Sequence, residues 1–212
     1  MLYFLLPQKF RWGFLLIASY YFYINIKPVY ALLLAGVTIT TYLFTNLIAK
    51  TKTERRKRQL LIADIIITLL PLFFFKYFNF VNEGVFTLLN YAGLHLPLPH
   101  LSLFLPVGIS FYTFMAVGYA IDVYNEEIDA EKNFGIVALF LSFFPVVMSG
   151  PIERAPNMFK QFKGKLQFNY QMMVAGLQLM LWGYFMKLAV ADRLSIYIDV
   201  VFKNADQDVC FS

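Results

Sequence analysis

Long uncharged apolar runs constrain the fold of this chain more than any other feature. "VYALLLAGVTITTYLFTNLIA", residues 29–49, carries no charge and matches the roughly 20 residues that a helix needs to cross a bilayer. Of all residues, 59% are hydrophobic and 15% are charged, whereas about 25% are charged in soluble domains. We expect an all-α polytopic membrane protein of about five to six transmembrane or re-entrant helices, part of a larger helical bundle. The expected spans are 12–26, 29–49, 60–78, 107–124, 134–150 (re-entrant) and 170–190, in one membrane-embedded region, 1–212.

The basic residues are clustered. "KTKTERRKR", residues 50–58, is dominated by Lys and Arg, whereas no Lys or Arg occurs between Lys76 and Lys132. Because basic loops stay in the cytoplasm, we predict a multi-pass protein of the bacterial inner membrane with loop 50–58 cytoplasmic. A solvated basic linker that binds acidic lipid head groups fits the same placement. Such clustering, at a net charge of +5, argues against nucleic acid as a partner and for the lipid bilayer.

One apolar run is interrupted by helix breakers. Residues 134–150 contain Pro145 and end at Gly150-Pro151, and a single crossing would place the basic residues of 154–165 outside. Either the chain departs from the positive-inside rule here or the run bends at Pro145 and returns without crossing. We favour the return, and a re-entrant segment needs protein or a wet cavity to satisfy its backbone groups.

Two charged residues near this run are candidate functional groups. Arg154 lies between Pro151 and Pro156, and a rigidly held guanidinium can bind the phosphates or carboxylates of an anionic donor. Glu153 is its obvious partner but, being adjacent, is poorly placed for a bidentate pair. The alternative is an arginine that binds lipid phosphate or braces a loop. Asp122 either caps the polar turn 125–133 or faces the bundle.

The other reactive residue types form no apparent site. Prolines separate His95 from His100, so we expect no metal site there, and Cys210 has no thiol context. We identify no catalytic set in the chain.

Three blocks resemble a known family. "LPVGISFYTFMAVGYAIDVY" (105–124), "LFLSFFPVVMSGPIERAPNMFKQF" (139–162) and "GLQLMLWGYFMKLAVADRL" (176–194) occur in the order found in membrane-bound O-acyltransferases of the alginate O-acetylation and teichoic-acid D-alanylation type. The start of the chain, 3–23, is similar to the same family.

The resemblance implies transfer of an acyl group, expected to be acetyl, to hydroxyls of an exported polysaccharide or cell-envelope glycan. It implies no bound cofactor, an acyl donor such as acetyl-CoA or an acyl-carrier thioester, and periplasmic or extracellular acetyl-transfer proteins as partners. The family's catalytic histidine would lie beyond residue 212, so we expect an N-terminal portion that is inactive without its C-terminal half. The residues expected near the donor cavity are Arg154, Glu153, Pro151, Gly150, Asp122 and Tyr124.

Two alternatives stay open. The chain could be a small polytopic transporter or channel in which the re-entrant segment lines the path, although it lacks the repeats typical of such proteins. It could also be the unstable product of a gene remnant, because helix faces that normally pack on a missing half would be exposed.

Overall fold

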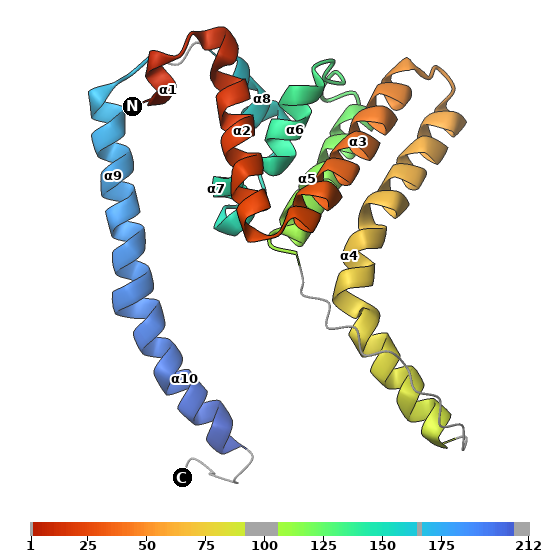
Figure 1. Ribbon diagram of the computed structural model, residues 1–212, viewed down its shortest axis with the longest axis vertical. Helices are drawn as coiled ribbons and strands as arrows, with labels where there is room; N and C mark the ends of the chain where they lie inside the picture. Colours follow the sequence, from red (N-terminus) through yellow and green to blue (C-terminus); the bar gives the residue numbers. More distant parts are fainter. Residues whose placement is uncertain (1, 92–105, 165–166, 206–212) are drawn as a thin grey trace. The chain divides into compact units, whose positions relative to one another are not determined.

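The computed structural model describes residues 2–91, 106–164 and 167–205, and every regular element in these ranges is a helix (Figure 1). The all-α prediction is therefore confirmed. The chain divides into two compact units, Met1–Leu166 and Gln167–Ser212. His95, His100, Cys210 and the expected extended segment 94–105 lie outside the described residues.

The first unit begins with four helices, which end at Tyr91. Lys27 is extended because a residue before proline avoids the helical region, and Pro28 then opens the next helix. The buried Thr38 and Thr45 donate their hydroxyls to the carbonyls of Leu34 and Thr41, at 2.8 and 2.7 Å. These internal bonds let threonine lie in apolar surroundings. The helices are α1 (Leu2–Leu5), α2 (Gln8–Ile26), α3 (Pro28–Lys50) and α4 (Glu54–Tyr91).

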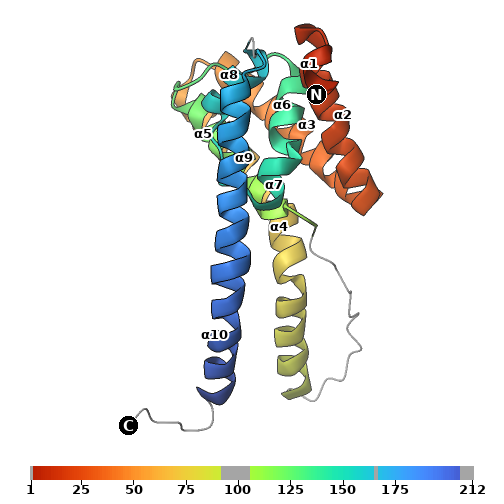
Figure 2. The same ribbon diagram turned by 90° about the vertical axis from the view of Figure 1, so that its left-hand side faces the viewer.

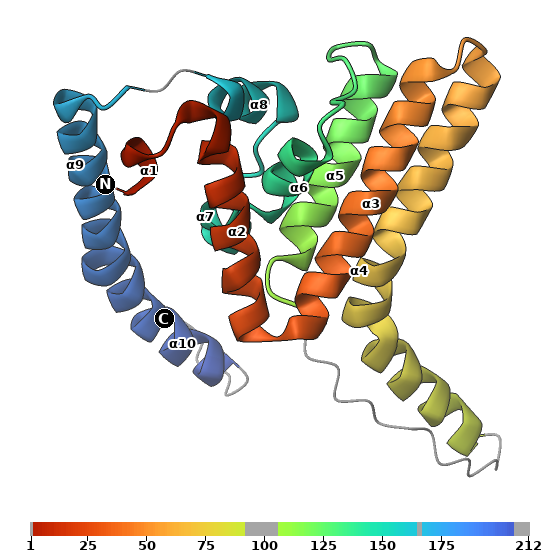
Figure 3. The ribbon, with the colours of Figure 1, turned by 45° about the horizontal axis from the view of Figure 1, so that its top comes forward.

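Helix α4 is longer than the expected span 60–78. It continues through Pro71 to Tyr91 as one helix and changes direction near its middle (Figures 1 and 3). With α3 and α5 (Ile109–Tyr124) it forms a layer of three helices in mutual contact.

Three helices in the described ranges are long and apolar enough to cross a membrane: Pro28–Lys50, Glu54–Tyr77 and Tyr170–Phe202. They correspond to the expected spans 29–49, 60–78 and 170–190. The segments expected at 107–124 and 134–150 form shorter apolar helices.

The interrupted run forms two short helices, α6 (Phe134–Ser142) and α7 (Phe144–Ser149), followed by α8 (Ala155–Lys163). The break lies at Phe143 and not at Pro145, because Pro145 occupies the first turn of α7, where its missing N–H costs nothing. The nine residues of α6 rise only about 14 Å, too little to cross a bilayer.

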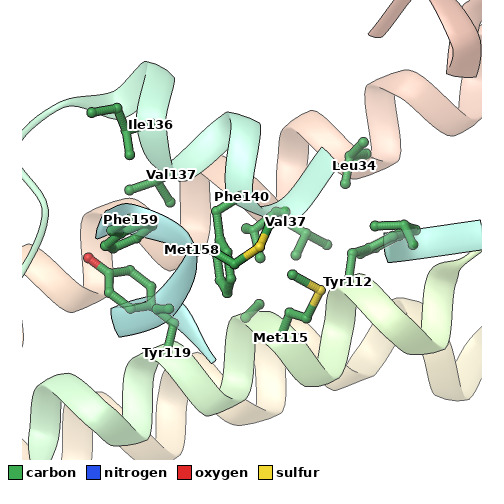
Figure 4. Packing of buried hydrophobic residues seen from close by; sticks show 14 of the residues in the cluster. Leu34, Val37, Tyr112, Met115, Tyr119, Ile136, Val137, Phe140, Met158 and Phe159 are labelled. Atoms are coloured by element: carbon green, nitrogen blue, oxygen red, sulfur yellow. The ribbon is translucent and has the colours of Figure 1, made fainter. Parts of the chain in front are cut away.

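Aromatic side chains join α5, α6 and α8 into one core. The ring of Phe159 lies 5.3 Å from the rings of both Tyr119 and Phe140, and all three side chains are buried. Figure 4 shows this cluster beside Met115 and Met158. Helix α8 is therefore held against α5 and α6 by apolar packing as well as by charges.

The second unit is one helical stretch made of α9 (Tyr170–Phe185), a π-helical turn (Met186–Ala191) and α10 (Asp192–Ala205), visible in Figure 2. Asn169 caps α9 by accepting a hydrogen bond from the Met172 N–H at 3.2 Å. Within α9 and the π-helical turn no residue is buried.

Candidate functional site

Arg154 joins two acidic residues at one end of the first unit. It forms an ion pair with Asp122 at the C-terminal end of α5, and its Nη2 atom lies 2.8 Å from the Glu127 carboxylate in the following loop. The Asp122 side chain is 4% exposed and that of Arg154 62% exposed. The cation therefore reaches from the surface to neutralise a buried carboxylate.

The loop 125–133 is anchored from several helices. The Glu131 N–H donates to the Tyr119 phenol oxygen at 2.8 Å, and the Glu131 carboxylate pairs with Lys163 of α8. The Tyr42 hydroxyl of α3 donates to the Lys132 carbonyl at 2.9 Å. This loop is therefore bonded to α3, α5 and α8.

Helix α4 reaches the same loop through its first turn. Lys57 donates to the Glu126 carboxylate at 2.6 Å and lies 3.3 Å from Glu54. A pocket of about 320 Å³ opens beside this pair, between the end of α3, the start of α4 and the loop. Its lining is Ile48, Ala49, Lys57, Val123, Glu126, Ile128, Asp129 and Ala130. We use the name charged end of the first unit for the region that contains four ion pairs: Lys57–Glu126, Arg154–Asp122, Arg154–Glu127 and Lys163–Glu131.

The charges affect protonation. The hydrogen bond and positive charge of Lys57 lower the pKa of Glu126. The hydrogen bond and negative charge of Asp122, followed by the charge of Glu127, raise the pKa of Arg154. Both groups therefore stay ionised at neutral pH, and the ion pairs persist.

The segment between α5 and α8 leaves the charged end and returns to it. It starts at the loop 125–133, and Arg154 at its far end pairs with Asp122. Between these points, Val147 of α7 lies beside the opposite end of α5: a Cβ placed on Gly108 would lie 2.2 Å from Val147 Cγ1. Gly108 has φ +75°, a conformation that glycine adopts without strain. The segment thus reaches the beginning of α5 and comes back.

The chain is similar to several curated proteins over nearly all of its length. The chain is 33% identical over 202 residues to the probable alginate O-acetylase AlgI of Pseudomonas aeruginosa, covering 95% of this chain and 38% of that protein. It is 31% identical over 207 residues to the Azotobacter vinelandii protein of the same name, covering 97% and 41%. It is 30% identical to the peptidoglycan O-acetyltransferase of Helicobacter pylori in an alignment of 219 positions, gaps included, which covers 90% of this chain and 40% of that protein.

The relatives that the chain matches over nearly all of its length are alginate O-acetylases and a peptidoglycan O-acetyltransferase. The relatives therefore confirm the resemblance found in the sequence. The chain spans about two fifths of the length of these relatives. No family model matches it. No solved structure matches it either.

The structure brings together only some of the candidate residues predicted from the sequence. Asp122 and Arg154 come into direct contact. Glu153, expected as a partner of Arg154, forms no ion pair in the described part of the chain, because Asp122 and Glu127 take that role. Gly150 ends α7 by donating its N–H to the Val146 carbonyl at 2.8 Å. Pro151 is exposed, and Tyr124 packs against the core.

Sequence reasoning missed the acidic partners. Glu126 pairs with Lys57 of α4, and Glu127 and Glu131 pair with basic residues at the two ends of α8, yet in the sequence all three belong to a polar turn. The available signal was charge: the charged residues of the turn 125–133 are mostly acidic, whereas those of 50–58 and 154–163 are mostly basic. That complementarity favours contact between these segments but does not select the pairs.

Among the described residues, no group of three or more His, Cys, Asp or Glu side chains could hold a metal ion. The charged end therefore consists of ion pairs and hydrogen bonds between protein groups.

Proposed function

We propose that this chain is the N-terminal portion of a membrane-bound O-acyltransferase that transfers an acetyl group to hydroxyls of an exported polysaccharide or cell-envelope glycan. The observation that carries the proposal is the similarity over 95% of the chain to an alginate O-acetylase. The same similarity favours a transferase over the alternative of a small transporter or channel. An acyltransferase requires an acyl donor, and we propose acetyl-CoA or an acyl-carrier thioester.

We further propose that the segment 134–150 is re-entrant and that it forms one wall of the donor cavity, near Gly150, Pro151 and Arg154. Its two flanks both lie at the charged end, which supports a return without crossing. The ion pairs of Arg154 favour its alternative role of bracing this wall, because both carboxylates already neutralise the guanidinium. The catalytic residue and periplasmic or extracellular partners would then lie outside this chain.

The proposed topology places the charged end, with the loop 50–58, in the cytoplasm. In a Cys210→Ser background, single cysteines at Glu126 and Asn157 should react with a membrane-impermeant maleimide in inside-out vesicles and not in intact cells. Reaction of the Asn157 cysteine in intact cells would show that 134–150 crosses the bilayer.

The transfer activity is tested in a bacterium that lacks its own alginate O-acetylase. The gene, expressed together with the sequence downstream of the codon for Ser212, should restore O-acetyl groups to the secreted polysaccharide, measured by chemical shift in NMR spectra. Residues 1–212 alone should restore none. Acetylation by residues 1–212 alone would contradict the absence of the catalytic group from this chain.

The bracing role of Arg154 is tested in the same assay. Arg154→Gln should lower the acetyl content, whereas Arg154→Lys, which keeps one cation near Asp122, should retain part of it. Glu153→Gln is the matched control, since Glu153 forms no ion pair in the described part of the chain. Equal acetylation by the glutamine and lysine variants of Arg154 would contradict the proposed wall.

A further inference from the structure

Helix α4 has two chemically different faces along its first five turns. Lys57, Asp64 and Thr68 fall on one side of the helix, and all three point inward: the Lys57 side chain is 12% exposed, and Asp64 and Thr68 are fully buried. At about 100° per residue, these positions lie within an arc of about 40°. This inward face contacts α3 and α5.

The opposite face of α4 carries two arginines above an apolar stripe. Ile62, Ile66 and Phe73 are 46%, 58% and 63% exposed. The same helical geometry places these three residues within an arc of about 80° that also contains Arg55 and Arg58. Only 17% of the apolar window of this helix is buried, so the stripe is open along a helix long enough to cross a membrane.

The two arginines have no protein partner in the part of the chain that the structure describes. Both are exposed, and Glu54, one turn before Arg58, lies 3.3 Å from Lys57 instead. Arg58 precedes Ile62 by one turn, a rise of about 6 Å. Guanidinium groups at the end of such a stripe can bind the phosphates of lipids whose acyl chains lie along it.

We propose that the outward face of α4 is a binding site for an anionic phospholipid. The lipid phosphate lies against Arg55 and Arg58, and an acyl chain lies along Ile62, Ile66 and Phe73. An anionic lipid fits better than a zwitterionic one, because two neighbouring guanidinium groups without protein counter-ions favour a ligand of net negative charge. This inference is independent of the acyl transfer proposed above.

The test uses the purified protein and native mass spectrometry. The protein is titrated in detergent with phosphatidylglycerol or with phosphatidylcholine of the same acyl chains, and the occupancy of the first bound lipid is measured. Phosphatidylglycerol should bind more tightly than phosphatidylcholine. Arg55→Gln/Arg58→Gln should abolish this preference, with a loss of about fivefold in affinity for each arginine removed.

A second double variant removes the same charge elsewhere. Lys52→Gln/Arg56→Gln neutralises two exposed cations next to the site but outside the stripe, and it should keep the preference for phosphatidylglycerol. An equal loss in both double variants would overturn the proposal, since it would reveal diffuse attraction only. Competition by the free head group glycerophosphoglycerol at matching concentrations would also overturn it, because the site requires the acyl chain. The circular dichroism spectrum of each variant checks that its helices are intact.

Discussion

Arg154 forms an ion pair with Asp122, a buried carboxylate 32 residues earlier in the chain. The pair joins the end of α5 to the start of α8 and therefore closes the segment that contains α6 and α7. Glu127 binds the same guanidinium nitrogen, so one cation holds a helix end and a loop together. The charged end depends on this arrangement for its shape.

Arg154→Gln should lower the thermal midpoint of the protein in detergent by several degrees, because it leaves the Asp122 carboxylate buried without a cation. Asp122→Asn should also lower the midpoint, and the effects of the two changes should not add, because both remove the same pair. The measurement is thermal unfolding followed by circular dichroism. The adjacent Glu153→Gln should change the midpoint little. Fully additive effects of the Arg154 and Asp122 variants would contradict the pairing.

Neutralising Asp64 should not destabilise the protein, in contrast to neutralising Asp122. Asp64 is fully buried, its Oδ2 atom has no hydrogen-bond partner among the described residues, and its other oxygen lies 3.5 Å from the Thr68 hydroxyl. Asp64→Asn should leave the free energy of unfolding within about 1 kcal/mol or raise it, because it removes a buried acid that lacks a cation. Thermal unfolding at neutral pH measures this. A midpoint that falls as far as in Asp122→Asn would point to a partner for Asp64 outside the described residues.

Gly108→Ala should destabilise the first unit by about 1–3 kcal/mol, because the new Cβ would meet Val147 and the residue would keep a positive φ. Gly118→Ala in the same helix is the matched control. Nothing lies within 4 Å of a Cβ at Gly118, so alanine there should stabilise the helix by about 0.5–1 kcal/mol. Chemical denaturation in mixed micelles measures both. An unchanged stability of Gly108→Ala would show that α7 does not pack against the start of α5.

The pair between Lys57 and Glu126 should weaken in acid. Because Lys57 lowers the pKa of Glu126 in the folded protein, the pair contributes stability above the ordinary carboxyl pKa and loses it as pH falls through the lowered value. A pH titration of ¹³C-labelled glutamate, with Glu126 assigned by mutation, should give a pKa below the usual 4.3 or so for Glu126. Lys57→Met should return this pKa toward that value. The absence of any change in Lys57→Met would contradict the pairing.

The local helices and the membrane class follow from the sequence, because both depend on features that neighbouring residues carry. A charge-free run of 21 residues such as 29–49 can satisfy its backbone in a bilayer only as a helix, whatever it packs against. Proline fixes where α3 begins. The re-entrant course of 134–150 was predicted from the unfavourable charge placement of a single crossing and stays a prediction. The resemblance to membrane-bound O-acyltransferases could be inferred from the sequence as well, since the motif blocks occur in order along one chain.

Only the tertiary structure decided which charges meet. Asp122 is buried and paired because α8 folds back against α5, a choice made by packing among Tyr119, Phe140 and Phe159 across 40 residues. The adjacent Glu153 was the nearer partner for Arg154 in sequence, but the ion pair forms with Asp122, which lies close in space. Likewise, the sequence alone does not show which basic residue of α4 faces inward, because Lys57 stands between Arg56 and Arg58. Contact with α3 and α5 turns Lys57 inward to Glu126 and leaves Arg55 and Arg58 outside, because a helix buries one side only.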